Sequence, residues 1–173
     1  MNIVEILKEA DHDRKKLSHE KNEMIFKNLL SHGYKRMEEV YKKTDPSYGD
    51  TLFMAVQDLL IWIMFADNQL IQGEYDAYEE FCSWAKYEAL SVKSVIERKN
   101  ELTIDYLISV IKHIVQTRKH IPDDDYESFV KALCYMALFG DKDLDQEEYV
   151  LISCFFNEDV DYCPSWEDYL KEK

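Results

Sequence analysis

The sequence predicts an all-α protein, a helical bundle with an internal pseudo-twofold duplication. Apolar residues recur with a helical period over most of the 173 residues. No stretch shows the sustained alternation of apolar and polar residues that a strand needs, and only 4 glycines interrupt the helical pattern. With a mass of 20.6 kDa and 46% hydrophobic residues, the chain is long and apolar enough to form one compact domain.

The duplication is indicated by a helix, an acidic turn and a second helix, which occur at residues 59–75 and again 74 residues later, at 133–149. This offset places Asp67 on Asp141, Leu70 on Leu144, Gln72 on Gln146 and Glu74 on Glu148. Apolar matches are common between two buried helices, so the informative part is the recurrence of an Asp, a Gln and a Glu in register. We therefore expect the two turns to superimpose, with both leucines buried between helices.

Residues 1–43 are predicted to form an N-terminal helical extension. A short amphipathic helix is expected over about 2–20, followed by a longer one over about 20–43, which Gly33 weakens but does not end. Residues 44–50 then collect proline, glycine and small polar side chains, which is typical of a loop.

The duplicated core is predicted to span residues 51–157. The helix over about 50–65 is apolar nearly all round after Leu59, and its counterpart over about 124–139 has the same character, so we expect the two to be enclosed as the central pair of the bundle. Each is followed by a second helix, over about 72–89 and 146–156. Two further helices are expected at 91–98 and 103–118, the latter ended by Pro122. The tail, 158–173, is expected to pack on the core as a short helix capped by Ser165.

The charge balance restricts the partners. With 21 basic and 35 acidic side chains, the formal net charge is −14, which disfavours binding to nucleic acid or to an anionic membrane. No apolar run approaches the roughly 20 residues that span a bilayer, and the N-terminus does not have the pattern of a signal peptide. The four cysteines show no CxxC spacing and are expected to be free thiols. We expect a cytoplasmic protein without membrane insertion that binds cations or a protein partner.

The two acidic turns are the candidate metal sites, because Ca²⁺ and Mg²⁺ prefer oxygen ligands. The candidate ligands are Asp67, Asn68 and Glu74 in the first turn and Asp141, Asp143, Asp145 and Glu148 in the second. These turns are not EF-hands: counted from Asp141, the sixth position is Gln146 where a glycine is required, and the twelfth is Ile152 where a bidentate glutamate is required.

Two interpretations of these acids are open. In the first they only shape the turns: Asp67 and Asp141 accept backbone N–H groups, Asp145 caps the next helix, and Glu148 completes a capping box. Glu74 would act similarly but more weakly, because Ile71 occupies the cap position. In the second interpretation the same turns also bind Ca²⁺ or Mg²⁺ weakly. The sequence contains no nucleophile turn, phosphate-binding glycine loop or HExxH motif, so we expect no enzymatic activity.

The repeated pattern resembles the twofold motif of the TerB-like family, known from tellurite resistance. The resemblance rests on an apolar helix ending in Ala-Asp or Gly-Asp, a leucine three residues after the aspartate and a glutamate seven residues after it, within about 51–157. It implies a helical bundle without enzymatic activity and a role in stress-response or phage-defence assemblies. It also implies that Asp67, Glu74, Asp141 and Glu148 are candidate cation ligands. Asn68 and Lys142 depart from the glycine that many members have after the motif aspartate.

Two functional hypotheses follow. The first is a non-enzymatic TerB-like scaffold or sensor in a bacterial stress response, with weak divalent-cation binding at the acidic turns. The second is an acidic interaction protein, comparable to an immunity protein or a nucleic-acid mimic, that blocks a basic partner.

Overall fold

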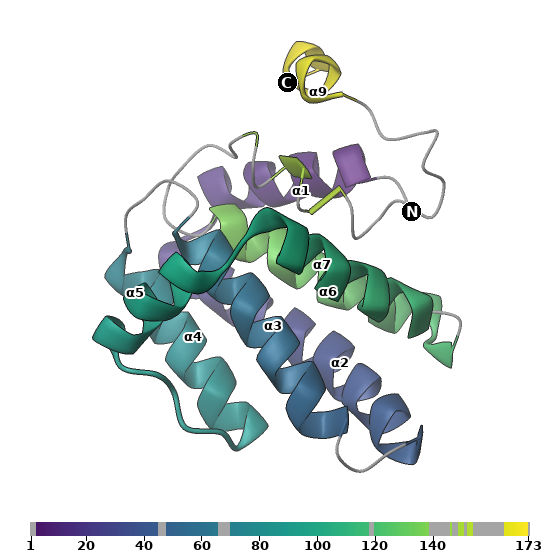
Figure 1. The fold of residues 1–173 in the computed structure, drawn as a ribbon. Helices are drawn as coiled ribbons and strands as arrows, with labels where there is room; N and C mark the ends of the chain where they lie inside the picture. The colour runs from purple at the N-terminus through teal and green to yellow at the C-terminus, as the bar shows by residue number, and fades with distance from the viewer. Residues whose placement is uncertain are drawn as a thin grey trace.

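The computed structural model describes residues 3–44, 48–65, 70–117, 120–138, 146, 149–150, 152–153 and 165–172. Its helices are α1 (Ile3–Lys16), α2 (His19–Thr44), α3 (Tyr48–Met64), α4 (Gln72–Ala85), α5 (Val92–Glu101), α6 (Ile104–Thr117), α7 (Asp123–Leu138) and α9 (Trp166–Glu172) (Figure 1). No strand occurs within these ranges, which confirms the all-α prediction for the described part of the chain.

Helix α3 lies inside the bundle. From Leu59 to Met64 every side chain is at most 7% exposed, and α3 contacts α2, α4, α5, α6 and α7. The prediction that this helix is enclosed is therefore confirmed. Burial of its apolar surface stabilises the fold by about 25 cal/mol for each Å² removed from water. Apolar as α3 is, none of the described helices combines the length and hydropathy that crossing a membrane requires.

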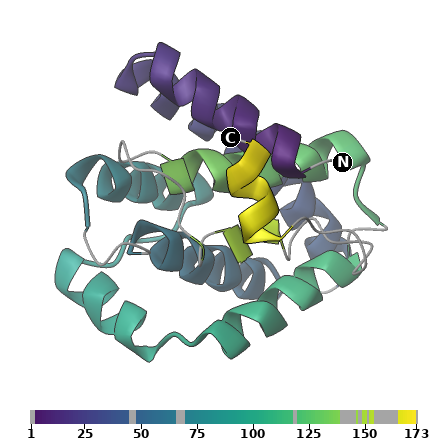
Figure 2. The same cartoon turned by 90° about the horizontal axis from the view of Figure 1, so that it is seen from above.

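Among the described helices the most extensive pair is α2 with α7, whereas the sequence pattern predicts α3 with α7 as the central pair. Helix α1 also packs on α7, and Figure 2 shows α1 on one side of the bundle with α5 and α6 on the opposite side. Phe26, Leu30, Tyr34 and Met37 of α2 are each at most 2% exposed and belong to the same apolar core as α3. Residues 3–44 thus contribute directly to the core.

Gly33 lies where α2 crosses α7. A Cβ atom built on Gly33 would be 2.5 Å from both the Cα and the Cβ of Phe129, and closer still to the backbone nitrogen of that residue. Real Cβ atoms do not approach other atoms so closely, so only glycine permits this contact between the two helices. Gly33 weakens α2 as an isolated helix, but it allows the largest helix pair of the bundle to form.

Helix α4 ends at Ala85, four residues before the predicted end, because Lys86 adopts a left-handed conformation with φ 66° and ψ 37°. The Lys86 N–H donates to the Ser83 carbonyl (3.1 Å), and the Tyr87 N–H donates to the Cys82 carbonyl (2.9 Å). These two hydrogen bonds form a Schellman motif. The left-handed residue of this motif is usually glycine, and here it is Lys86. The chain then turns towards α5.

The C-terminal helix α9 begins after Ser165. The backbone N–H of Asp168 donates to the Ser165 hydroxyl oxygen (3.2 Å), and this hydroxyl donates to the Asp168 carboxylate (2.9 Å). The ring of Trp166 lies 5.4 Å from the ring of Tyr149, and Trp166 is partly buried against the core. A local capping pair thus sets where α9 begins, and an aromatic contact attaches it to the bundle.

Candidate functional site

Glu74 is the one predicted cation ligand that the structure describes. Asp67 and Asn68 of the first turn, and Asp141, Asp143, Asp145 and Glu148 of the second, lie outside the described residues. Leu70 is partly buried and packs against the core, whereas Leu144 also lies outside the described residues. The superposition of the two turns therefore stays a prediction.

Glu74 is buried, with 2% of its surface exposed, in the first turn of α4. Its Oε2 accepts the Ile71 N–H (3.3 Å), and its own N–H donates to the Ile71 carbonyl (3.1 Å). Isoleucine has no side-chain acceptor, so the glutamate supplies the side-chain half of the cap, in a position where the helix dipole favours negative charge. Within the described ranges, no group of three or more His, Cys, Asp or Glu side chains is placed to hold a metal ion. The hydrogen bond with the Ile71 N–H is the contact that the capping interpretation predicts for Glu74.

A fully buried carboxylate, Asp58, connects three helices. Arg98 of α5 donates from Nε to Oδ1 and from Nη2 to Oδ2, both at 2.8 Å. The Tyr106 hydroxyl of α6 donates to the same Oδ2 at 2.9 Å. The hydrogen bonds that Arg98 donates to Asp58 are the main reason that the pKa of Arg98 is raised above its ordinary value. Both carboxylate oxygens are engaged, so Asp58 acts as an anchor for α5 and α6 on α3.

Sequence reasoning missed this anchor, although a signal for it was present. Asp58 is a charged residue inside the apolar stretch from Leu52 to Met64. A buried charge is rare unless it is paired. Its position therefore indicated a partner, but not that the partner would be Arg98, 40 residues further along the chain.

Two tyrosines of α4 hold the connection to α5. The Leu90 N–H donates to the Tyr78 hydroxyl oxygen (3.0 Å), and the Tyr75 hydroxyl donates to the Leu90 carbonyl (2.8 Å). The Tyr78 hydroxyl in turn donates to Gln57 Oε1 of α3 (2.8 Å). Tyr78 and Phe81 of α4 lie in the core and are at most 3% exposed.

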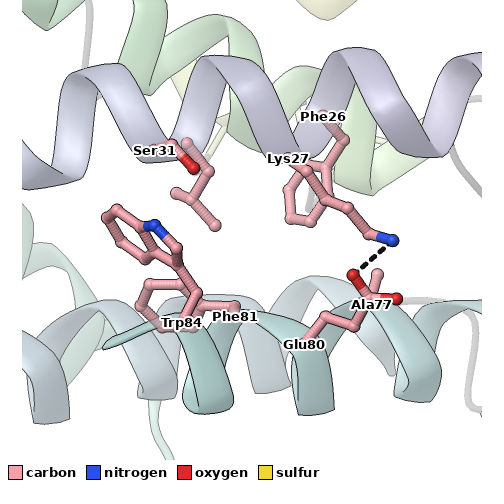
Figure 3. Close-up of a pocket in the computed structure, with 8 residues that line it drawn as sticks. Phe26, Lys27, Ser31, Ala77, Glu80, Phe81 and Trp84 are labelled. Atoms are coloured by element: carbon pink, nitrogen blue, oxygen red, sulfur yellow. Dashed lines mark ion pairs between the residues drawn. The ribbon is translucent and has the colours of Figure 1, made fainter. Parts of the chain in front are cut away.

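A small cavity of about 110 Å³ lies between α2 and α4 (Figure 3). It is lined by Phe26, Lys27, Leu30, Ser31, Ala77, Glu80, Phe81 and Trp84. Figure 3 shows Lys27 of α2 reaching the Glu80 carboxylate of α4, so that an ion pair joins the two helices beside the cavity. The volume is below that of an engineered apolar cavity that binds benzene, about 150 Å³, so this cavity suits one small apolar group at most.

Alkaline pH is expected to destabilise the protein through three buried tyrosines, Tyr34, Tyr78 and Tyr135. Burial raises the pKa of each above the usual value of about 10. Above pH 10 the unfolded chain therefore loses these protons while the folded protein keeps them, so stability is full below pH 10 and falls as pH rises. The expected loss is about 1.4 kcal/mol per tyrosine for each pH unit above 10. Urea unfolding at pH 8 to 11.5, followed by circular dichroism, measures this loss of unfolding free energy.

Tyr135→Phe is the control for this prediction. Tyr135 is 7% exposed and its hydroxyl donates to Asp13 of α1 (2.7 Å), so the variant should be less stable at pH 8. It should also lose stability less steeply above pH 10, because it has one proton fewer to lose. A stability that is constant up to pH 11.5 would contradict the assignment.

Comparison of the chain with protein-family models, with curated proteins and with solved structures gave no match. The resemblance to the TerB-like family therefore stays a prediction from the two motifs.

Proposed function

We propose that the protein is a non-enzymatic TerB-like scaffold or sensor in a bacterial stress response, with weak divalent-cation binding at its second acidic turn. The observation that favours the second turn over the first is the engagement of Glu74. Its buried carboxylate accepts the Ile71 N–H at the start of α4, which leaves Asp67 and Asn68 as the candidate ligands of the first turn. The second turn has Asp141, Asp143 and Asp145 in addition to Glu148, the counterpart of Glu74.

Calorimetric titration with Ca²⁺ at low ionic strength tests the cation site. We expect a Kd weaker than about 10⁻⁵ M, because the turn has no glutamate at the position that supplies two oxygens in tight sites. The double variant Asp143→Asn, Asp145→Asn should weaken binding further. Glu74→Gln is the matched control, since it keeps an acceptor for Ile71 and should leave Ca²⁺ binding unchanged. Sub-micromolar binding, or an equal loss in Glu74→Gln, would contradict the proposal.

A second candidate function is that of an acidic protein that occupies the basic face of a partner. The distribution of charged residues along the sequence favours it. Residues 141–173 contain eleven acidic and three basic residues, which is −8 of the total of −14. Such an excess of negative charge attracts a complementary basic surface, and salt screens the attraction over about 8 Å at physiological ionic strength.

Pull-down from the native host separates the two candidates. A basic partner that dissociates as salt rises supports the acidic interaction protein, whereas a partner that requires divalent cation or survives salt supports the scaffold. The variant Asp141→Asn, Glu148→Gln should abolish capture by the scaffold. It should weaken capture only slightly in the other case, because the two charges are a small part of the net charge of −14.

A further inference from the structure

An open groove of about 460 Å³ lies between α3 and α6. It is lined by Asp50, Thr51, Leu52, Met54, Ala55, Tyr106, Ser109, Val110 and Ile114. Two of these side chains keep much of their surface in solvent, with Met54 at 45% and Tyr106 at 40% exposed. Apolar surface that is exposed and gathered in a groove is typical of a site for a binding partner.

Hydrogen bonds to buried and neighbouring residues fix both walls of the groove. The Tyr106 hydroxyl donates to the buried Asp58 carboxylate, which Arg98 also binds, so the α6 wall is fixed to α3. At the start of α3, Asp50 accepts a hydrogen bond from the Tyr87 hydroxyl, and the Tyr87 ring stacks on Phe53 with centroids 3.8 Å apart. A groove fixed in this way needs little rearrangement to bind, which favours affinity.

The charge of the groove and of the whole chain indicates which kind of ligand the groove binds. Among the described residues that line it, Asp50 carries the one formal charge, and its carboxylate is exposed. The whole chain carries −14. A fixed carboxylate beside an apolar groove, in a negative field, favours a ligand with an apolar face and a positive charge at one end.

We propose that the α3/α6 groove binds an amphipathic helical segment of a partner protein, which inserts apolar side chains beside Met54 and places a lysine or arginine next to Asp50. A small molecule in so open a groove would remain largely in water, whereas a helix presents apolar residues at i, i+3/i+4 and i+7 along a groove between two helices. The inference rests on the proposed role as a scaffold and names the kind of partner segment that the scaffold recognises.

The test uses a fluorescein-labelled synthetic helical peptide of ~16 residues, with leucines at i, i+4 and i+7 flanked by lysines, and a second peptide with glutamate at every lysine position. Fluorescence anisotropy with the full chain should show binding of the lysine peptide about tenfold tighter than the glutamate peptide. Met54→Lys should weaken binding of the lysine peptide by about tenfold or more, since it both fills the groove and repels the peptide. Asp50→Asn should weaken it severalfold.

Met24→Lys is the matched control. Met24 is 58% exposed on α2 and does not line the groove, so this variant makes the same change in composition and charge elsewhere. It should leave peptide binding nearly unchanged. Equal effects of Met24→Lys and Met54→Lys would show that the peptide binds the acidic surface in general and would overturn the proposal, as would equal affinity for the two peptides or no binding at all.

Two further outcomes are decisive. A dimer in analytical ultracentrifugation that Met54→Lys dissociates would make a second copy of this chain the occupant and would overturn the proposal. Capture of the native partner that survives in Met54→Lys would contradict the groove as the partner site. The function proposed above would still stand, because Ca²⁺ titration and the Asp141 and Glu148 variants test it independently.

Discussion

Replacing Gly33 with alanine is expected to lower the free energy of unfolding by about 2 kcal/mol. The added Cβ would lie 2.5 Å from the Cα and Cβ of Phe129, so α2 and α7 must separate, and such overpacking typically costs about 1 to 3 kcal/mol. Alanine is the better helix former by about 1 kcal/mol, so a site without this contact would become more stable instead. Urea unfolding followed by circular dichroism measures the difference in unfolding free energy between the variant and the parent protein. A loss of stability indicates the close contact with α7, and a gain indicates that the contact is absent.

Asn28→Ala on the same helix is the control for Gly33. Asn28 is exposed, so its replacement should raise stability slightly through helix propensity alone. Gly33→Leu, in contrast, should prevent α2 from packing on α7 and leave no cooperative unfolding transition. A Gly33→Ala variant as stable as the parent protein would show that α2 and α7 do not cross at this residue.

Removal of Asp58 is expected to cost about 3 to 5 kcal/mol of stability. Asp58→Ala leaves the Arg98 guanidinium and the Tyr106 hydroxyl without their shared acceptor and opens a cavity beside α3. Arg98→Ala should cost at least as much, because it leaves a carboxylate with 0% of its surface exposed without its charged partner. The free energies of unfolding of both single variants, from urea titrations, measure these losses.

The double variant Asp58→Met, Arg98→Met tests whether the two residues act as a pair. It should recover most of the stability lost in either single variant, because no charge is then left buried without a partner. Arg36 and Glu39 form an exposed pair, each side chain being nearly half exposed, so Glu39→Ala should cost less than about 1 kcal/mol. Losses of that small size at Asp58 would contradict its role as an anchor.

Local features of this fold could be predicted from the sequence because their causes are local. Apolar residues nearly all round α3 predict that this helix is enclosed, and the cap that Glu74 provides for α4 joins residues only three positions apart. The end of α4 was predicted too late, because the left-handed residue there is Lys86 and not the glycine that usually marks such a position.

The pairing of helices was decided by tertiary structure alone. An apolar stripe shows that a helix face is buried, but it does not identify the helix that covers it, so the packing of α2 on α7 at Gly33 could not be predicted. For the same reason, the contacts of Asp58 with Arg98 and Tyr106, 40 and 48 residues away, depend on how α5 and α6 pack on α3. The α3/α6 groove exists only after this docking, because its two walls come from helices that a sequence pattern describes separately.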